Sequence, residues 1–146
     1  MKIVICGSMA FAKQMKEVKE CLENRGHRVY LPQLVDRFIE DENWRRRVTR
    51  GNSQDRQSGA SFKKEHDLIR AHYRKIKQSD AILVLNYKKK KIPGYIGGNT
   101  FLEMGFAYVL GKKIYLLYSI PKIDFCYEEI IAMEPHVLDG DLEKIK

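Results

Sequence analysis

The sequence has few of the features that mark a secreted or membrane-spanning protein. Its three cysteines, Cys6, Cys21 and Cys126, are odd in number and widely separated, which fits neither a disulfide framework nor a CxxC metal site. No apolar stretch approaches the ~20 residues of a membrane span, and the N-terminal apolar run is too short for a signal peptide. We therefore expect a soluble protein of the reducing cytoplasm, without a membrane partner.

Two ligand-binding patterns are also missing. The four histidines, His27, His66, His72 and His136, do not form a ligand-spaced cluster with the cysteines, so the sequence predicts no metal site. The loop that begins at Gly7 lacks the full G-x-G-x-x-G pattern, which argues against a dinucleotide. We expect no cofactor.

Length and composition favour one compact domain. The chain has 146 residues, 44% of them hydrophobic, which suffices for one core but not for two. Its net charge is +8, with many basic residues in 43–77 and in the run 88–91. Such runs are usually a solvated face, and the functional alternative is attraction of a small phosphorylated ligand. Nucleic acid is less favoured because no base-stacking aromatic series accompanies the charge.

Short apolar runs alternate with amphipathic stretches, as in a doubly wound, Rossmann-like α/β fold. Ligands of such folds bind at the carboxyl ends of the strands. From the apolar patterns, strands are expected at Lys2–Cys6, Arg28–Leu31, Ala81–Leu85, Lys113–Tyr118 and Val137–Leu138. Helices are expected at Phe11–Leu22, at Phe62–Lys77, around Glu103 and at Tyr127–Met133.

The segment from about 40 to 63 has a different character. It is polar and contains glycine, it has no clear periodicity, and it includes Arg45–Arg47 and Arg50–Gly59. We interpret it as a basic, mobile insertion in a single 1–146 domain. A long connection of this kind is either disordered or a lid, and a lid over an anionic ligand would explain its arginines.

The stretch 92–107 organises the rest of the chain. Gly97 and Gly98 allow the backbone to approach a ligand closely, and the helix that follows offers unpaired N–H groups to an anion. Glu103 lies about one turn inside that helix, on a mostly apolar segment. A carboxylate is costly to bury there, which makes Glu103 the first candidate catalytic residue. The alternative is an acid stabilised by the helix dipole or by a subunit contact.

Further candidates follow the first and the central strand. Gly7 and Ser8 end the first strand, where Ser8 either contacts a ligand or caps the first helix. Asn86 and Tyr87 end the central strand; Asn86 is a candidate for a sugar hydroxyl or a base edge. Tyr87 and Tyr95 either stack on a base or are half-buried loop aromatics.

Three motifs together resemble the nucleoside 2-deoxyribosyltransferase superfamily. They are Cys6-Gly7-Ser8, the segment Ser79–Val84 and the segment Gly97–Ala107. The opening Cys-Gly-Ser is most similar to the 2'-deoxynucleoside 5'-phosphate N-hydrolase branch. The resemblance implies a flavodoxin-like three-layer α/β sandwich with a central parallel sheet. It also implies a homo-oligomer, a dimer or higher, that acts on the N-glycosidic bond of a small-molecule nucleoside or nucleotide.

The resemblance also implies a covalent mechanism. The glutamate of the family's E-x-G-x-A motif is the nucleophile at the anomeric carbon, and Glu103 occupies that position. Release by water gives hydrolysis, and release by a second base gives transfer. The alternative is a nucleotide-binding module of the same fold without turnover.

Two positions depart from the family pattern. The family has a second carboxylate in the helix before the central strand, and His72 stands there; a histidine can donate a proton but cannot copy an anion. The alternatives are an exposed, inert His72, or Asp67 or Glu65 acting after a register shift. The family's phosphate-binding serine is replaced by Gly97-Gly98-Asn99-Thr100, where backbone N–H groups and Thr100 could still hold a phosphate.

Overall fold

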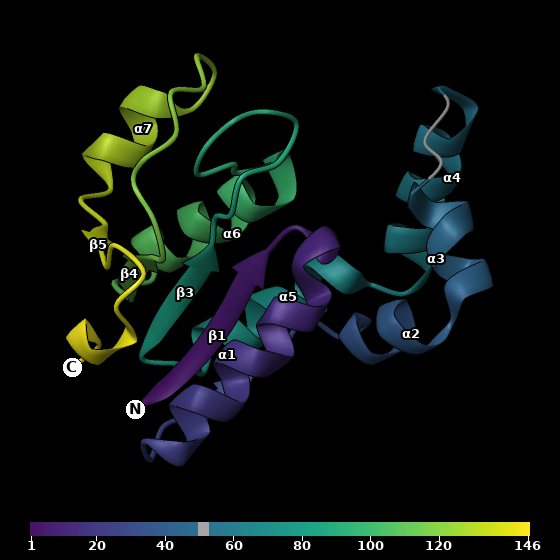
Figure 1. The fold of residues 1–146 in the computed structure, drawn as a ribbon. Helices are drawn as coiled ribbons and strands as arrows, with labels where there is room; N and C mark the ends of the chain where they lie inside the picture. The colour runs from purple at the N-terminus through teal and green to yellow at the C-terminus, as the bar shows by residue number, and fades with distance from the viewer. Residues whose placement is uncertain (50–52) are drawn as a thin grey trace.

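A sheet of parallel strands forms the middle layer of the protein (Figure 1). The computed structural model describes residues 1–49 and 53–146. Its five strands are ordered β2-β1-β3-β4-β5, which is the flavodoxin-like order. The strands are β1 (Lys2–Gly7), β2 (Arg28–Tyr30), β3 (Ala81–Leu85), β4 (Lys113–Leu116) and β5 (His136–Val137).

The two central strands are apolar on both faces, as expected for strands covered by helices on both sides. β1 and β3 pair in parallel, with Ile5 opposite Leu83 and Gly7 opposite Leu85. Every residue of β3 is buried. The predicted α/β class and parallel central sheet are confirmed, and the predicted strands all form, with ends that differ by at most two residues.

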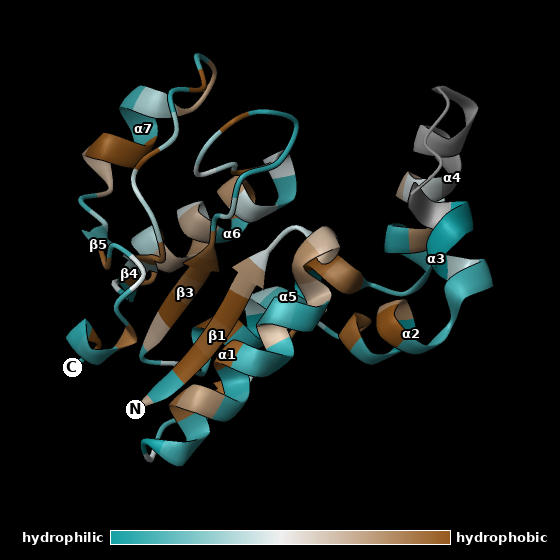
Figure 2. Ribbon diagram, viewed as in Figure 1, coloured by the Kyte–Doolittle hydropathy of each residue, from teal (hydrophilic) through white to brown (hydrophobic). Residues whose placement is uncertain are grey.

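Helices cover both faces of this sheet (Figure 2). α1 (Ala12–Asn24) covers one face, and α5 (Leu68–Lys77) and α6 (Gly98–Val109) cover the other. The helical elements are η1 (Met9–Phe11), α1 (Ala12–Asn24), α2 (Val35–Glu40), α3 (Glu42–Thr49), α4 (Ser53–Glu65), α5 (Leu68–Lys77), α6 (Gly98–Val109), α7 (Tyr127–Ala132) and η2 (Leu142–Lys144).

Side-chain alternation along β1 decides which residues meet which helices. Ile3 and Ile5 belong to the cluster that contains Met15 of α1. Val4 and Cys6 point the other way, into the cluster that contains Met104 of α6. Because successive strand residues face opposite sides, Cys6 shares a layer with the residues of α5 and α6.

Helices also form where the sequence predicted an irregular insertion. Trp44 of α3 is 7% exposed, and its ring packs against Phe38 at 6.4 Å and Phe62 at 5.8 Å between centroids. The guanidinium of Arg37 lies 4.6 Å from the same ring. The sequence did not reveal these helices because their apolar anchors are spread over three elements, so that no single window shows a helical period.

Part of this insertion lies outside the described residues. Residues 50–52, within the stretch Arg50–Gly59, are among those that the structure does not describe. The mobility of the insertion therefore stays a prediction.

The predicted helix Phe62–Lys77 is interrupted. α4 ends at Glu65 and α5 begins at Leu68, with Asp67 between them at a φ of 48°. A left-handed backbone at a residue other than glycine costs on the order of 1–2 kcal/mol, and it breaks the helix here. The continuous apolar pattern gave no sign of this break.

None of the helices among residues 1–49 and 53–146 has the length and apolar character needed to cross a membrane.

Candidate active site

The candidate site lies where β1 and β3 end side by side. The chain turns off these two neighbouring strands in opposite directions, which is the topological switch point where α/β sheets bind ligands. Gly7 and Ser8 follow β1, and Asn86 and Tyr87 follow β3. A Cβ atom at Gly7 would lie 3.0 Å from the carbonyl oxygen of Leu85, so the two strand ends can lie this close only with glycine at position 7.

Glu103 is buried beside this edge on the second turn of α6. Glu103 is 6% exposed. The side-chain amide of Asn99, one turn earlier, donates a hydrogen bond of 2.8 Å to Oε1 of Glu103. This i, i+4 contact fixes the orientation of the carboxylate.

Two further polar side chains meet the Glu103 carboxylate. His72 of α5 is 7% exposed, and its Nε2 lies 3.6 Å from Oε1 of Glu103. Cys6 of β1 is fully buried, and its Sγ lies 3.5 Å from Nε2 of His72. Three residues from three elements thus bring a thiol, an imidazole and a carboxylate together; we call Cys6, His72 and Glu103 the donor cluster.

Burial dominates the electrostatics of this cluster. Desolvation raises the pKa of Glu103, while hydrogen bonds from Cys6 and Asn99 and the charge of Lys63 lower it, so that the pKa is about 7. Burial, with a smaller contribution from Lys75, lowers the pKa of His72 to about 4. His72 is therefore neutral near pH 7, and its contact with Glu103 is not an ion pair.

Burial shifts the pKa of the Cys6 thiol in the same direction as the pKa of the Glu103 carboxyl group. Burial, and then the nearby charge of Glu103, raises the pKa of Cys6 well above its ordinary value. The thiol is therefore protonated near pH 7, and its sulfur lies in hydrogen-bonding contact with Nε2 of His72. Near neutral pH, Glu103 is the member of the cluster that changes charge.

The structure corrects two expectations about histidine. The alternative of an exposed His72 is wrong, because His72 lies on the same buried face of α5 as Ile76, four residues later. The statement that no histidine clusters with a cysteine is also wrong, because His72 meets Cys6 across 66 residues of sequence. Spacing along the chain could not show this contact, which is made only by folding.

Cys6 is a site residue that sequence reasoning missed. The signal was available, since Cys6 alternates with Ile5 at the end of a buried strand, directly before Gly7 and Ser8. The face of the strand could not be assigned from sequence, because both faces of β1 are apolar.

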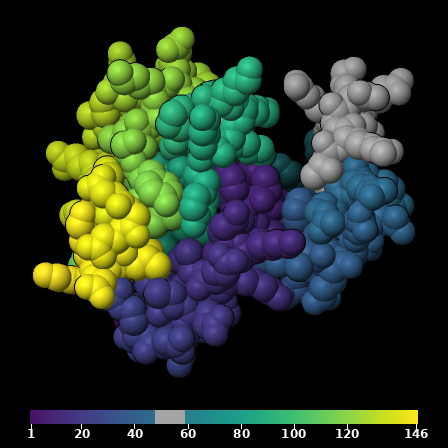
Figure 3. Space-filling view, viewed as in Figure 1, coloured from purple at the N-terminus to yellow at the C-terminus, as the bar shows by residue number. Residues whose placement is uncertain are grey.

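The strand-end residues are placed as follows. Ser8 is the N-cap of η1, with its Oγ accepting a hydrogen bond from the N–H of Ala10, and it also accepts one of 2.6 Å from Nζ of Lys89. Ser8 thus caps the short 3-10 turn that leads into α1, whereas the N-cap position of α1 itself is Phe11. Figure 3 shows the residues after β1 directly beneath the loop that follows β3, which carries Lys89.

Asn86 and Tyr87 differ in accessibility. Asn86 is 0% exposed, and its amide bonds to the backbone of Tyr118 and Ser119. Tyr87 is half-buried, with its ring 5.2 Å from that of Phe11 and 5.5 Å from that of Tyr118. Asn86 therefore braces the site, while Tyr87 retains an accessible edge.

The glycine loop and its helix lie where the sequence placed them. α6 begins at Gly98, with Gly97 as an extended N-cap and no side-chain cap. Thr100 is 3% exposed, whereas Asn99 and Gly98 are exposed. The first N–H groups of α6 thus lack a side-chain partner at the cap.

The other acids lie apart from the donor cluster. Asp67 contacts Arg70 at 3.4 Å and Arg74 at 3.2 Å on the surface of α5. Asp80 accepts a hydrogen bond of 2.6 Å from the backbone N–H of Lys2, where it braces the starts of β1 and β3. Among the described side chains, the residue from α5 that meets Glu103 is His72.

Comparison with known proteins gives a family model and a solved structure that each match most of the chain. A family model described as nucleoside 2-deoxyribosyltransferase matches residues 4–130. The solved structure of a CMP N-glycosidase from Clostridium botulinum is similar at 18% identity and a TM-score of 0.49, and the match covers 94% of this chain and 84% of that one. No curated protein matches the chain. The matched segment 4–130 includes all three residues of the donor cluster.

Proposed function

The chain belongs to the nucleoside 2-deoxyribosyltransferase family, and we propose that it cleaves or transfers the N-glycosidic bond of a (deoxy)nucleoside or its 5'-monophosphate, with Glu103 as nucleophile. One observation carries the proposal. A carboxylate is buried at the switch point of the sheet, where the Asn99 amide orients it. Such a group is expensive to keep for stability alone.

The proposed reaction has two displacements. An oxygen of Glu103 bonds to the anomeric carbon while the carbon–nitrogen bond breaks. The electron pair of that bond leaves with the base, and the base takes up a proton from solvent. Water or a second base then attacks the same carbon and releases the Glu103 carboxylate. Covalent capture divides one difficult displacement into two easier ones, each with an oxocarbenium-like transition state beside a carboxylate.

We assign His72 a supporting role in this reaction. Because its pKa is lowered to about 4, the neutral imidazole can offer an N–H to the departing base or to the sugar, but it is a weak source of a full proton at pH 7. Its position 3.6 Å from Oε1 of Glu103 supports a role beside the reacting carbon in either case.

Two lysines support a phosphorylated substrate. Nζ of Lys89 reaches Oγ of Ser8 across the strand ends, and the charge of Lys63 on α4 acts on the Glu103 carboxylate. Cations placed this way favour an anion near the sugar site. We propose that they act with the backbone at Gly7, the glycine loop 97–98 and Thr100 to hold a 5'-phosphate, and that Tyr87 contacts the base.

We also propose that the chain works as a homo-oligomer, a dimer or higher. Leu102 and Val109 lie on one outer face of α6 and are 41% and 84% exposed, and Ile69 of the neighbouring α5 is 44% exposed. Association of two copies through this face would remove the apolar area from water. Sedimentation velocity of the wild type and of Val109→Glu tests this, since the variant should shift toward monomer.

The second candidate function is a nucleotide-binding module without turnover. The observation that favours it is the neutral imidazole of His72 at the position where the resemblance expects a carboxylate. This alternative predicts saturable nucleotide binding with no product.

The deciding experiment uses pooled deoxynucleosides and deoxynucleoside 5'-monophosphates. We expect intact-protein mass spectrometry to show an adduct of sugar or sugar-phosphate mass, and chromatography to show free base. Glu103→Ala should lose both signals, while Glu128→Gln, an exposed carboxylate on α7, should keep them. If no base is released and Glu103→Ala binds nucleotide as well as the wild type, the non-catalytic module replaces the enzyme.

A further inference from the structure

The donor cluster brings together three different metal-ligating groups. Sγ of Cys6, a ring nitrogen of His72 and a carboxylate oxygen of Glu103 all lie within 4.8 Å of one another. The residues are 0%, 7% and 6% exposed, and they come from β1, α5 and α6. Their positions are fixed by the packing of one sheet face against two helices.

Two of the three separations match the edges of a tetrahedral zinc site, and the third, from the sulfur of Cys6 to the Glu103 carboxylate, lies within 4.8 Å. Bonds of about 2.3 Å to sulfur and about 2.0–2.1 Å to nitrogen and oxygen, at tetrahedral angles, place the ligand atoms about 3.3–3.6 Å apart. The observed separations are 3.5 Å from sulfur to Nε2 and 3.6 Å from Nε2 to Oε1. An ion could therefore be held with little movement of two of the three ligands.

We propose that Cys6, His72 and Glu103 bind a divalent ion of the zinc class, with one coordination position left for water. A thiolate, an imidazole and a carboxylate form a donor set suited to zinc or cobalt, whereas magnesium and calcium require mostly oxygen ligands. The thiolate and the carboxylate together balance the charge of the ion, so the buried site is neutral overall. Binding releases the thiol proton of Cys6 to solvent.

The surroundings support ligation. The Asn99 amide holds Oε1 of Glu103 at 2.8 Å, which is the kind of outer contact that orients a ligating carboxylate. Nε2 of His72 is the ring nitrogen that faces both partners, so the ligating tautomer carries its proton on Nδ1. The slight exposure of His72 and Glu103 gives the side from which an ion can enter.

The consequence for catalysis rests on the proposed function. A metal-bound Glu103 cannot attack the anomeric carbon, because its lone pair is engaged by the ion. Zinc should therefore inhibit base release, and a chelator should restore it. The binding itself rests only on the three side chains and does not require that the protein be an enzyme.

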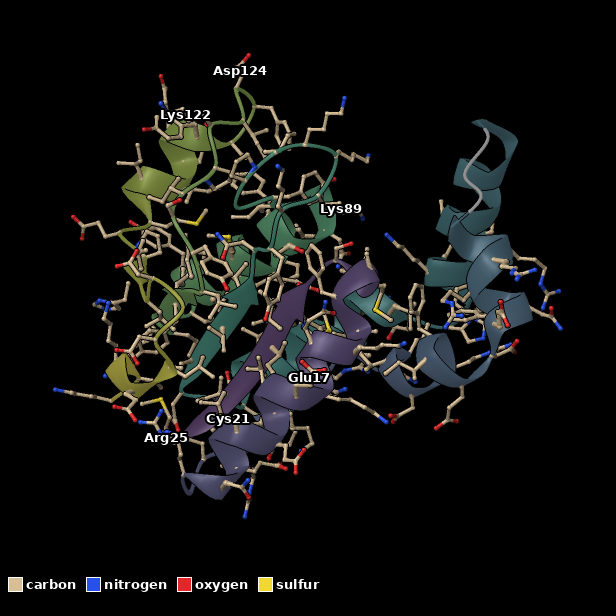
Figure 4. The ribbon with its side chains drawn as sticks, viewed as in Figure 1. Glu17, Cys21, Arg25, Lys89, Lys122 and Asp124 are labelled. Carbon is tan, nitrogen blue, oxygen red and sulfur yellow. The ribbon has the colours of Figure 1, made fainter. Side chains whose placement is uncertain are left out.

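The test uses the whole protein after chelator treatment, titrated with Co²⁺ alone and then with Zn²⁺ in competition. We expect one Co²⁺ per chain, with the intense visible bands of tetrahedral cobalt and a thiolate-to-cobalt charge-transfer band. Cys6→Ser should lose the charge-transfer band, and His72→Asn should bind at least tenfold more weakly. Cys21→Ser is the matched control, since Cys21 is exposed on α1, far from the strand ends (Figure 4).

Several outcomes decide the matter. Circular dichroism establishes whether each variant folds. If Cys6→Ser does not fold, Glu103→Gln provides the second binding test, because glutamine keeps the shape of the glutamate side chain. A charge-transfer band that survives in Cys6→Ser, or that disappears in Cys21→Ser, overturns the site. Failure of Co²⁺ and Zn²⁺ to bind at micromolar concentration, or binding of Mg²⁺ with equal affinity, overturns it as well.

The two proposals fail separately. Cobalt bands that depend on Cys6, in a protein that releases no base with or without chelator, would keep the metal site and remove the enzyme. Base release that Zn²⁺ leaves unchanged, in a protein that binds no Co²⁺, would keep the enzyme and remove the metal site.

Discussion

The side chain of Asn86 pairs with the backbone of Tyr118 as a neighbouring strand would. Oδ1 of Asn86 accepts a hydrogen bond of 2.8 Å from the Tyr118 N–H, and Nδ2 donates one of 3.0 Å to the Tyr118 carbonyl. Nδ2 also donates one of 3.0 Å to the carbonyl of Ser119. A Cβ atom at Gly94 would lie 2.5 Å from that same carbonyl oxygen, so the loop after β3 is held against the end of β4.

Asn86→Ala should therefore cost about 2–4 kcal/mol of unfolding free energy, because it removes a fully buried amide and leaves backbone groups unpaired. Urea unfolding of the wild type and the variant measures this. Asn24→Ala is the control, since Asn24 is exposed at the end of α1 and its loss should cost less than about 1 kcal/mol. A loss at Asn86 below about 1 kcal/mol would instead favour the ligand contact that the sequence suggested.

The fold could be predicted to the extent that apolar runs revealed it. β1, β3 and β4 are buried strands whose β-branched and aliphatic residues stand out against charged flanks, and the α6 helix follows Gly97 and Gly98 directly. The region 35–65 could not be predicted in this way. Its helices are fixed by tertiary contacts of a few aromatics, such as Trp44 with Phe62.

The site was predictable at Glu103 and not at Cys6. An acid on an apolar helix is visible in the sequence because its burial needs a reason. The meeting of Cys6 with His72 depends on which face of β1 is turned toward α5, and a strand that is apolar on both sides does not reveal its faces. Site residues that depend on strand facing become visible only in three dimensions.

Base release should depend on pH through Glu103. A carboxylate must be ionised to act as the proposed nucleophile. The pKa of Glu103 is about 7 because burial outweighs the hydrogen bonds from Cys6 and Asn99 and the charge of Lys63, while neutral His72 adds no charge. In chelator, kcat/KM should rise about tenfold per pH unit below 7 and level off above about 8. A profile that is flat from pH 5.5 to 8 would contradict this role.

The raised pKa of Glu103 should also make the unfolding free energy depend on pH. Because folding raises the pKa of Glu103 from 4.5 to about 7, ionising this carboxyl costs about 3 kcal/mol more in the folded than in the unfolded protein. This cost is absent below pH 4.5, develops between 4.5 and 7, and is complete above 7. Glu103→Gln should thus be more stable than the wild type by about 1–3 kcal/mol at pH 8.5.

The comparison needs two pH values and one control. In chelator, the gain of Glu103→Gln should shrink toward zero or become a loss at pH 4, below both the ordinary pKa of 4.5 and the folded pKa of about 7, where both states of the wild type are largely protonated at this position. Glu128→Gln removes an exposed carboxylate from α7 and should show no such change. A Glu103→Gln variant that is less stable than the wild type at pH 8.5 would show that the carboxylate is stabilised by its surroundings.

Lys89 should determine the preference of the protein for 5'-monophosphates over nucleosides. It lies on the loop between β3 and α6 (Figure 4), where its Nζ donates to Ser8 at the end of β1, and burial together with the charge of Lys90 lowers its pKa. A half-buried cation that pairs with a phosphate contributes a charge-assisted hydrogen bond of about 1.5–3 kcal/mol. Lys89→Met should therefore lower kcat/KM for 5'-monophosphates at least tenfold and leave nucleosides within about twofold.

A change of net charge alone could also weaken binding of an anion, and Lys122→Met separates the two effects. Lys122 is exposed on the segment before α7 (Figure 4), so its loss changes the charge of the protein by the same amount without touching the strand ends. We expect Lys122→Met to retain the wild-type preference at 150 mM salt, where distant charges are screened. Equal losses in the two lysine variants would mean that the phosphate is attracted by the overall positive field, and that Lys89 has no specific contact with it.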